Sequence, residues 1–198
     1  MANSTQAFGL RPLYRINGGN IVTKQCYIAA TYATALYVGS PVTKTAATAD
    51  QDPTGQMPSM KIATVGAGSV WDGVIVSFEP LQSDLGKVYN PLSTARIANV
   101  CVDPEVVYAI RGDGAATPTK LMPGQNALAV ATSAGSTITG LCGWHLAEDT
   151  VAADQNFPMR IICLHDVEDN ELGVNAVYEV MLNTFYLTAG QKVGILAS

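Results

Sequence analysis

The sequence predicts an all-β protein, with an antiparallel β-sandwich or barrel body at residues 21–198 and an extended N-terminal arm at residues 1–20. Runs of β-branched and aromatic residues are separated by Gly and Pro, and no helical period is longer than two turns. Hydrophobic residues make up 48% of the 198 residues, so a single domain can bury a core without disulfides.

Ten stretches have the composition and length of strands. They are residues 21–29, 35–43, 59–65, 73–79, 94–103, 105–111, 126–132, 136–146, 157–165 and 176–187. Residues 80–90 are expected to form a short helical turn or an ordered loop. Residues 44–58 and 112–125 are rich in turn formers and are expected to be surface loops.

The stretch at 136–146 shows the alternation that is typical of antiparallel sheets. Its expected core face contains Trp144 and the residues at every second position from it, namely Ile138, Gly140, Cys142 and Leu146. Such alternation favours a sandwich or barrel over a parallel α/β sheet.

The first nineteen residues, MANSTQAFGLRPLYRINGG, have neither the apolar run of a signal peptide nor a helical period. We expect an extended arm that anchors itself on a partner through apolar and basic side chains. These side chains are Phe8, Leu10, Arg11, Leu13, Tyr14 and Arg15. The alternative is that the segment packs along its own sheet.

The net charge of −5 is unevenly distributed. No acidic residue precedes Asp50, so the leading segment carries +4, whereas the rest of the chain has 7 basic and 16 acidic residues, or −9. A basic segment on an acidic body suits an arm that finds an acidic neighbour. Two arginines on a net-acidic chain make a poor phosphate-binding patch, so we expect no direct contact with nucleic acid. No apolar run is long enough to predict a membrane span.

Four side chains have the ligand types of a zinc site: Cys142, His145, Cys163 and His165. Strand alternation places Cys142 and His145 on opposite faces unless a bulge intervenes. We therefore favour structural roles for them and expect no metal and no cofactor. The acidic run at 166–171 lacks the spacing of a calcium loop and favours a hairpin connection.

The residues predict no catalytic site, and we expect that the protein is not an enzyme. Both histidines lie in expected strands, and no Gly-x-Ser-x-Gly nucleophile turn is present. The tripeptide Arg111-Gly112-Asp113 is more typical of a turn after a strand than of an integrin ligand.

Five segments together resemble a family of virion proteins of tailed bacteriophages. They are, in order, AFGLRPLYRINGG, YIAATYATALYVGSPV, GVIVSFEPLQSDL, PLSTARIANVCVDPEVVYAI and LHDVEDNELGVNAVYEVMLN. The most specific parts are the AFGLRP opening, the FEP-x-x-x-DL segment and the DNE-x-G turn. The family is that of capsid decoration proteins, also called cement or head-stabilising proteins.

The resemblance implies a β-rich structural protein that is made in the host cytoplasm and assembles on the outer surface of the phage head. It implies that the major capsid protein and neighbouring copies of the same chain are the partners, and that binding stabilises the DNA-filled head. It carries over no catalytic residue.

Two other interpretations stay open. A head–tail or tail component of the virion also needs a β-rich body with a reaching arm. A glycan-binding β-sandwich needs an aromatic platform, for which an exposed Trp71 or the tyrosines are candidates.

Overall fold

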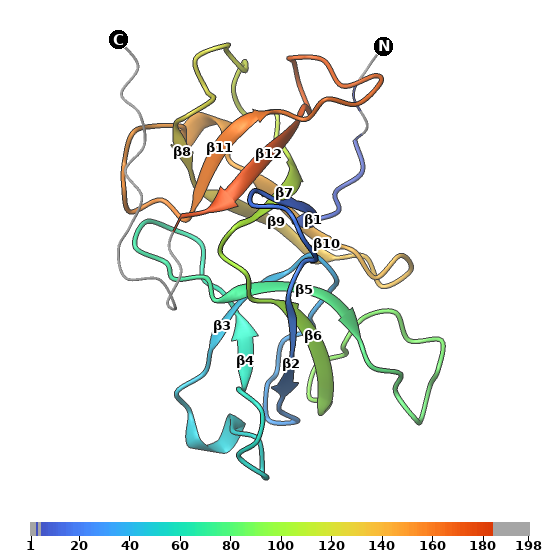
Figure 1. Ribbon diagram of the computed structural model, residues 1–198. Coiled ribbons are helices and arrows are strands. Elements are labelled where there is room, and N and C mark those ends of the chain that lie inside the picture. Colours follow the sequence, from blue (N-terminus) through green and yellow to red (C-terminus); the bar gives the residue numbers. More distant parts are fainter. Residues whose placement is uncertain (1–2, 4, 184–198) are drawn as a thin grey trace.

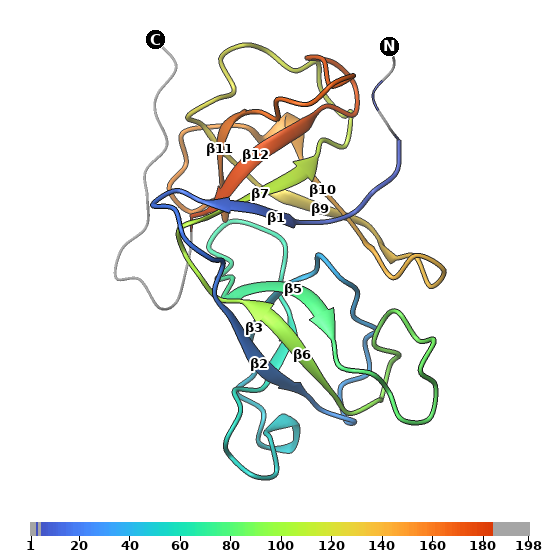
Figure 2. The ribbon, with the colours of Figure 1, turned by 45° about the vertical axis from the view of Figure 1, so that its right-hand side comes forward.

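The structure is a computed structural model that describes residues 3 and 5–183, and it confirms the expected all-β class with antiparallel sheets (Figures 1 and 2). Within these residues, helical structure is limited to two 3-10 turns, at Thr48–Asp50 and Glu148–Thr150. The strands gather in two lobes, which we call upper and lower from their places in Figure 1.

The upper lobe is built on a five-stranded sheet with the order β1-β7-β12-β11-β8. The strands are β1 (Arg11–Arg15), β7 (Val106–Arg111), β12 (Val177–Leu182), β11 (Met159–Leu164) and β8 (Asn126–Ala127). A hairpin of β9 (Ala129–Gly135) and β10 (Cys142–Leu146) completes this lobe, and a bridge between Leu146 and Gly112 links β10 to the end of β7. Strand β7 is buried along its whole length.

The lower lobe is a five-stranded sheet with the order β2-β6-β5-β3-β4. The strands are β2 (Thr23–Ile28), β6 (Arg96–Cys101), β5 (Gly73–Phe78), β3 (Pro41–Lys44) and β4 (Met60–Ile62). Its edges approach each other, because the Tyr27 amide on β2 donates to the Pro58 carbonyl just before β4, at 3.0 Å. The sheet therefore curls towards a small barrel around its own apolar cluster, which includes Ile28, Leu36 and Ile75.

Two tryptophans join the lobes. Trp71, just before β5, is fully buried, and its ring meets that of Trp144 on β10 edge to face, with centroids 6.0 Å apart and an interplanar angle of 61°. Both belong to one apolar cluster that also contains Leu10 and Tyr108, so the two lobes share a core. The expectation that Trp144 faces the core is confirmed. The expectation that Trp71 is exposed is wrong, because the shared core covers the whole ring.

The expected strand at 136–146 is shorter in the structure. Strand β10 begins at Cys142, and Ile138, expected on the core face, is 88% exposed. The Ser136 hydroxyl accepts hydrogen bonds from the amides of Ile138 and Thr139, and Gly140 adopts a φ of 73°. These local preferences of Ser and Gly form a turn where alternation alone predicts a strand.

The opening segment differs from the expected arm. Residues Arg11–Arg15 form β1, an edge strand of the upper sheet, in which Arg11 lies opposite Ala109 and Arg15 opposite Val106 of β7. Leu10 is only 2% exposed and belongs to the shared core. The segment is held by its own chain because β7 has a side free for pairing and the core accepts Leu10. This arrangement matches the alternative, in which the segment packs along its own sheet.

Replacing Trp71 with Ala should lower the free energy of unfolding by about 3–5 kcal/mol, because a fully buried indole leaves the shared core. Urea unfolding followed by circular dichroism measures the change. Trp71→Phe, which keeps an aromatic ring against Trp144, should cost less. A loss below about 1 kcal/mol for the Ala variant would contradict the importance of this contact.

Candidate functional site

The opening segment crosses the lower lobe at two glycines. Gly9 and Gly39 have φ values of 67° and 87°, and the Leu10 amide donates to the Gly39 carbonyl at 3.0 Å. A Cβ on Gly9 would lie 2.6 Å from that carbonyl oxygen. Because both positions need positive φ and have no space for a side chain, the crossing fixes where Phe8 and Leu10 lie.

An apolar pocket of about 340 Å³ lies beside this crossing. It is lined by Phe8, Leu10, Arg11, Pro12, Val38, Gly39, Ile75, Val76 and Leu141. Arg11 is the only charged residue among them, and its guanidinium lies over the Phe8 ring, 5.5 Å from the centroid. The pocket is therefore suited to an apolar side chain of a partner.

Exposed apolar side chains lie on the β9–β10 turn, whose residue Leu141 lines the pocket, and on the loop between β5 and β6, which contacts that turn. Ile138 lies in the β9–β10 turn, and Leu85, Val88 and Leu92 are exposed on the loop between β5 and β6. The loops touch each other, since a Cβ on Gly140 would lie 2.9 Å from the Cβ of Val88. Figures 1 and 2 both show the two loops side by side at the right. We call the pocket and these four side chains the apolar flank.

One buried arginine holds the loop between β5 and β6. Arg96 on β6 donates through Nε to the Glu79 carbonyl at 2.6 Å, through Nη1 to the Tyr89 carbonyl at 2.7 Å and through Nη2 to the Lys87 carbonyl at 3.0 Å. Charge-assisted hydrogen bonds from a planar guanidinium are strong and directional. Residues 80–90 thus form an ordered loop, one of the two forms expected. Arg96 fixes the backbone of this loop, from which Leu85 and Val88 project into solvent.

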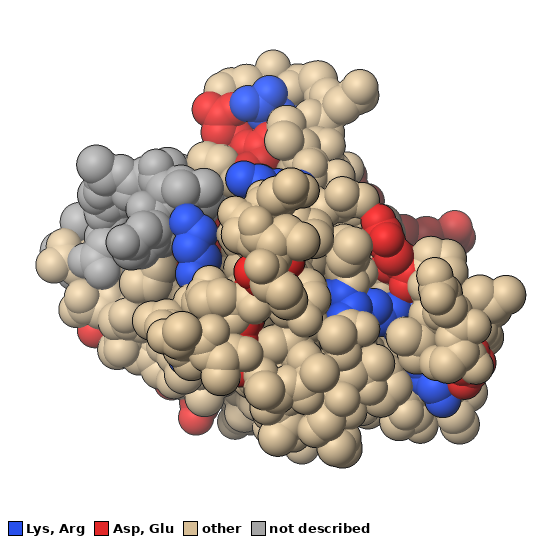
Figure 3. Space-filling view, turned by 90° about the horizontal axis from the view of Figure 1, so that it is seen from below, with Lys and Arg blue, Asp and Glu red and all other residues tan. Residues whose placement is uncertain are grey.

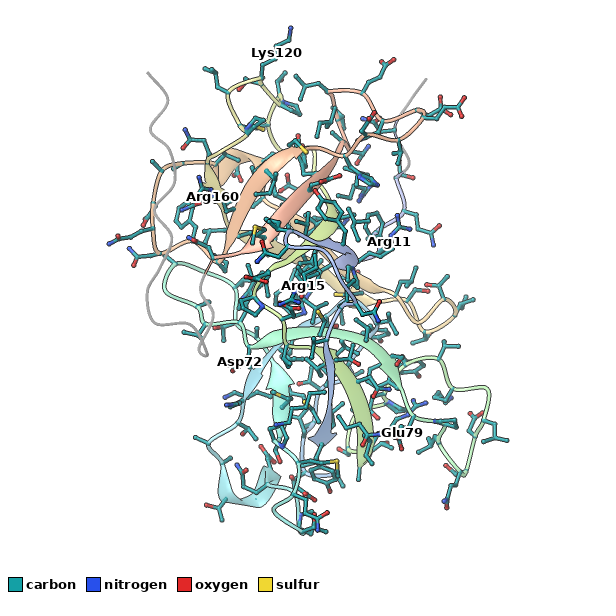
Figure 4. All side chains as sticks on the ribbon, viewed as in Figure 1. Arg11, Arg15, Asp72, Glu79, Lys120 and Arg160 are labelled. Carbon is teal, nitrogen blue, oxygen red and sulfur yellow. The ribbon has the colours of Figure 1, made fainter. Side chains whose placement is uncertain are left out.

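The structure divides the six residues that the sequence predicts as partner contacts. Phe8, Leu10 and Arg11 line the pocket, although Leu10 is almost fully buried. Leu13 is half-buried on β1. Tyr14 and Arg15 bond to other parts of their own chain, and Figure 4 shows Arg11 and Arg15 at β1.

Tyr14 fastens β1 to the face of the upper sheet. Its hydroxyl donates to Glu179 Oε2 at 2.7 Å, and Glu179 Oε1 lies 2.9 Å from His165 Nδ1. The hydrogen bond to Glu179, together with burial, raises the pKa of Tyr14 to about 12. Tyr14 therefore stays a neutral donor to the carboxylate across the physiological range.

Arg15 finds its acidic neighbour within the same chain. Its Nε lies 2.9 Å from Asp103 Oδ2 and its Nη2 lies 2.9 Å from Glu105 Oε2, both in the turn between β6 and β7. The Asn17 side chain also donates to Glu105, at 2.7 Å. Acidic side chains of the same chain thus neutralise part of the positive charge of the opening segment.

The Arg111-Gly112-Asp113 tripeptide is tied into the fold. Arg111 is buried, and its guanidinium donates to His145 Nε2 and, at 2.9 Å, to Asn175 Oδ1. Because His145 Nε2 accepts, its proton lies on Nδ1, which is 2.8 Å from Thr132 Oγ1. Burial and the charge of Arg111 lower the pKa of His145, so the imidazole is held neutral. Arg111 is therefore not presented as a ligand for another protein.

Glu148 is a second buried polar group of the upper lobe. Its Oε1 accepts from the Tyr178 hydroxyl and its Oε2 from the Gly114 amide, both at 2.8 Å. Burial raises the pKa of Glu148. The carboxyl group also borders a cavity of about 340 Å³, together with Met122 and Gln125. Its hydrogen bonds connect three segments of the lobe, which is a structural role.

The four candidate zinc ligands do not come together: Cys142 and His145 lie apart from the other two, whereas Cys163 and His165 both interact with Glu179. Strands β9 and β10 are paired with a shift in register between Cys142 and Trp144. Cys142 is buried in the core, His145 bonds to Arg111 and His165 lies against Glu179. Among residues 3 and 5–183, no three Cys, His, Asp or Glu side chains are grouped as in a metal site.

Charged side chains are sparse on the face formed by the lower lobe. Figure 3 shows them as scattered basic and acidic spots on a mainly uncharged surface. In the part of the chain that the structure describes, no helix has the length and hydropathy of a membrane span.

Comparison of the chain with models of protein families, with characterised proteins and with solved structures finds no match. The candidate site is therefore identified from the positions of the described residues alone. Sequence reasoning missed Ile138 and the loop residues Leu85, Val88 and Leu92 as surface features. The signal for Ile138 was the sequence Ser136-Thr-Ile-Thr-Gly140, which has the composition of a turn.

Deleting residues 1–15 should destabilise the body. The deletion removes β1, the buried Leu10 and the ion pair from Arg15, so we expect the free energy of unfolding to fall by about 3 kcal/mol or more. Deleting residues 1–5 should change it by less than about 1 kcal/mol. Thermal and urea unfolding of both truncations would test this, and equal stability of the two would contradict the role of β1.

The Glu179 carboxyl should contribute to acid sensitivity. Burial raises its pKa, but the hydrogen bonds from Tyr14 and His165 lower it, and the net direction is downward from 4.5. Its contribution to stability is therefore present above 4.5 and is lost as the pH falls through the lower, folded-state pKa. Glu179→Gln should show a shallower decline in urea midpoint over this acidic range than the wild type. An unchanged slope would contradict the assignment.

Proposed function

We propose that this chain is a structural virion protein of a tailed bacteriophage, a decoration or cement protein that binds the outside of the major capsid protein shell and stabilises the DNA-filled head. The observation that carries the proposal is that the exposed large apolar side chains lie on loops rather than on strands. Among the residues that the structure describes, 13 large apolar side chains are exposed, and all except Tyr14 lie outside the strands. A β-rich body that presents apolar residues on its loops is suited to docking on another protein.

The apolar flank is the best candidate for the contact with the shell. Leu85 is 78% exposed and Leu92 is 61% exposed on the loop that Arg96 holds. Because this loop is already ordered, docking through it would not incur the entropy cost of ordering a mobile segment. The resemblance of the sequence to decoration proteins supplies the identity of the partner, the major capsid protein.

The proposed action is mechanical. Packed DNA pushes the shell outward, and each bound copy adds buried area across a junction between capsid subunits. Binding to the assembled shell stabilises it by mass action, and the modest contribution of one site is repeated at every equivalent position. No covalent step is required.

The proposal predicts where the protein is found in virions. Quantitative mass spectrometry of purified particles should give a copy number comparable to that of the major capsid protein, and a cryo-EM map should show it outside the shell. A low copy number, with density at the portal or tail, would replace this function with a head–tail or tail role. Complete absence from particles would exclude a virion role.

The same proposal can be tested with variants. Leu85→Asp should weaken binding to heads that lack the protein, because it places a charge in the apolar contact. Leu121→Asp is a matched control, since Leu121 is also an exposed leucine but lies in the loop after β7. Equal binding by both variants and the wild type in a co-sedimentation assay would show that the flank does not contact the shell.

A further inference from the structure

We propose that the cavity beside Glu148 binds a small organic cation, a primary alkylamine in its protonated form. This cavity has a volume of about 340 Å³, at the small end of ligand pockets, so it suits a short molecule. It lies in the upper lobe and shares no lining residue with the pocket of the apolar flank. The proposal therefore does not rest on the proposed function.

Glu148 supplies the charge that a cation would pair with. It lines the cavity and is only 2% exposed. Among the described residues, no Lys, Arg or His nitrogen forms a salt bridge with it. The Tyr178 hydroxyl and the Gly114 amide, which donate to it at 2.8 Å, are both neutral. A buried carboxylate without an opposite charge is costly, and each of its oxygens can accept a further hydrogen bond. A cationic donor in the cavity would supply both.

The charges around the cavity also favour a cation. The wall segment 148–154 contains three acidic residues and no basic one. Lys120 is close in sequence to lining residues, but it borders a separate cavity and lies at the outer end of the upper lobe in Figure 4. The guanidinium of Arg111 donates to His145 and Asn175. Glu148 is therefore the only charged residue that lines the cavity.

A second buried polar side chain borders the same space. Gln125 is 7% exposed and lines the cavity, and its side-chain amide has no hydrogen-bond partner among the residues that the structure describes. The hydroxyl group of Thr119 is a third acceptor in the lining. A primary ammonium has three N–H donors, which suit a carboxylate, a carboxamide oxygen and a hydroxyl oxygen. A metal ion such as Ca²⁺ would need more oxygen ligands, and the described residues contain no group of three or more metal-ligating side chains.

The rest of the lining suits a short hydrocarbon chain. Leu121, Met122 and Val151 are apolar, and Ala152 and Ala153 have small side chains that leave the cavity open. These walls can pack against the methylene groups of an alkylamine while its ammonium group faces the polar side chains. A bare inorganic cation would leave this apolar area unused.

The walls are fixed by hydrogen bonds to the neighbouring segments. The Glu148 amide donates to Asp113 Oδ1 at 3.2 Å, and a Cβ on Gly112 would collide with the Glu148 carboxyl group, so this carboxyl group is closely confined. Asn126 and Ala152 exchange backbone hydrogen bonds of 2.8 and 2.9 Å. Because the site is already formed, binding would not require a segment to be ordered.

A ligand-observed NMR titration of the full chain at neutral pH tests the proposal. The probes are n-butylammonium, the neutral 1-butanol of the same chain length, and tetramethylammonium, a cation without N–H donors. Butylammonium should bind at least about tenfold more tightly than either control, because only it offers both a charge and N–H donors. No saturable binding of butylammonium, or equal binding of 1-butanol, would overturn the proposal.

Three variants locate the site. Glu148→Gln should weaken butylammonium binding by at least about tenfold. Ala152→Leu should weaken it as well, because it narrows the cavity from an exposed position and leaves the buried polar groups in place. Glu179→Gln is the matched control, since it removes another buried carboxylate of the same lobe, and should bind like the wild type.

Circular dichroism and thermal unfolding establish which variants are folded, and Ala152→Leu decides the question if Glu148→Gln does not fold. Wild-type affinity in a folded Glu148→Gln or Ala152→Leu chain would overturn the proposal, as would an equal loss of binding in Glu179→Gln. Since no capsid is present in these titrations, their failure leaves the proposed function standing.

Discussion

Where the opening segment crosses the lower lobe, two backbones come closer than any side chain would allow. Gly9 and Gly39 make this contact possible, and the hydrogen bond from the Leu10 amide to the Gly39 carbonyl fixes it. From this point Leu10 enters the shared core and the chain continues into β1 against β7. The same crossing places Phe8 at the pocket, so the fold of the upper sheet and the shape of the candidate surface depend on one close approach.

Buried polar groups hold several of the loops in place. Arg96, Arg111 and Glu148 each make several hydrogen bonds within the chain. Buried charged groups are tolerated when they are satisfied in this way, and such networks make the segments that they connect rigid. The loop between β5 and β6, which bears Leu85 and Val88, is therefore a preorganised part of the surface.

Much of the fold could be predicted from periodicity and composition. The β-branched runs at 73–79 and 105–111 correspond closely to β5 and β7, because packing on both faces of a strand leaves a strong apolar signal. The turn at Ile138 could not be found by alternation, since it depends on a serine hydroxyl that bonds to nearby amides. The place of the opening segment depends on an open strand edge about a hundred residues away in the chain, which local sequence does not reveal.

The pairing of β1 with β7 also constrains the order of folding. The lower lobe draws all its strands from one continuous stretch, from β2 to β6, so it can form as soon as that stretch has left the ribosome. Strand β1 is made first but must wait for β7, and the sheet that it borders is complete only when β12 has been synthesised. Strand β1 therefore stays unpaired until β7 has been made, whereas Gly39, the partner of Leu10 at the glycine crossing, is made much earlier and can hold the segment against the lower lobe in the meantime.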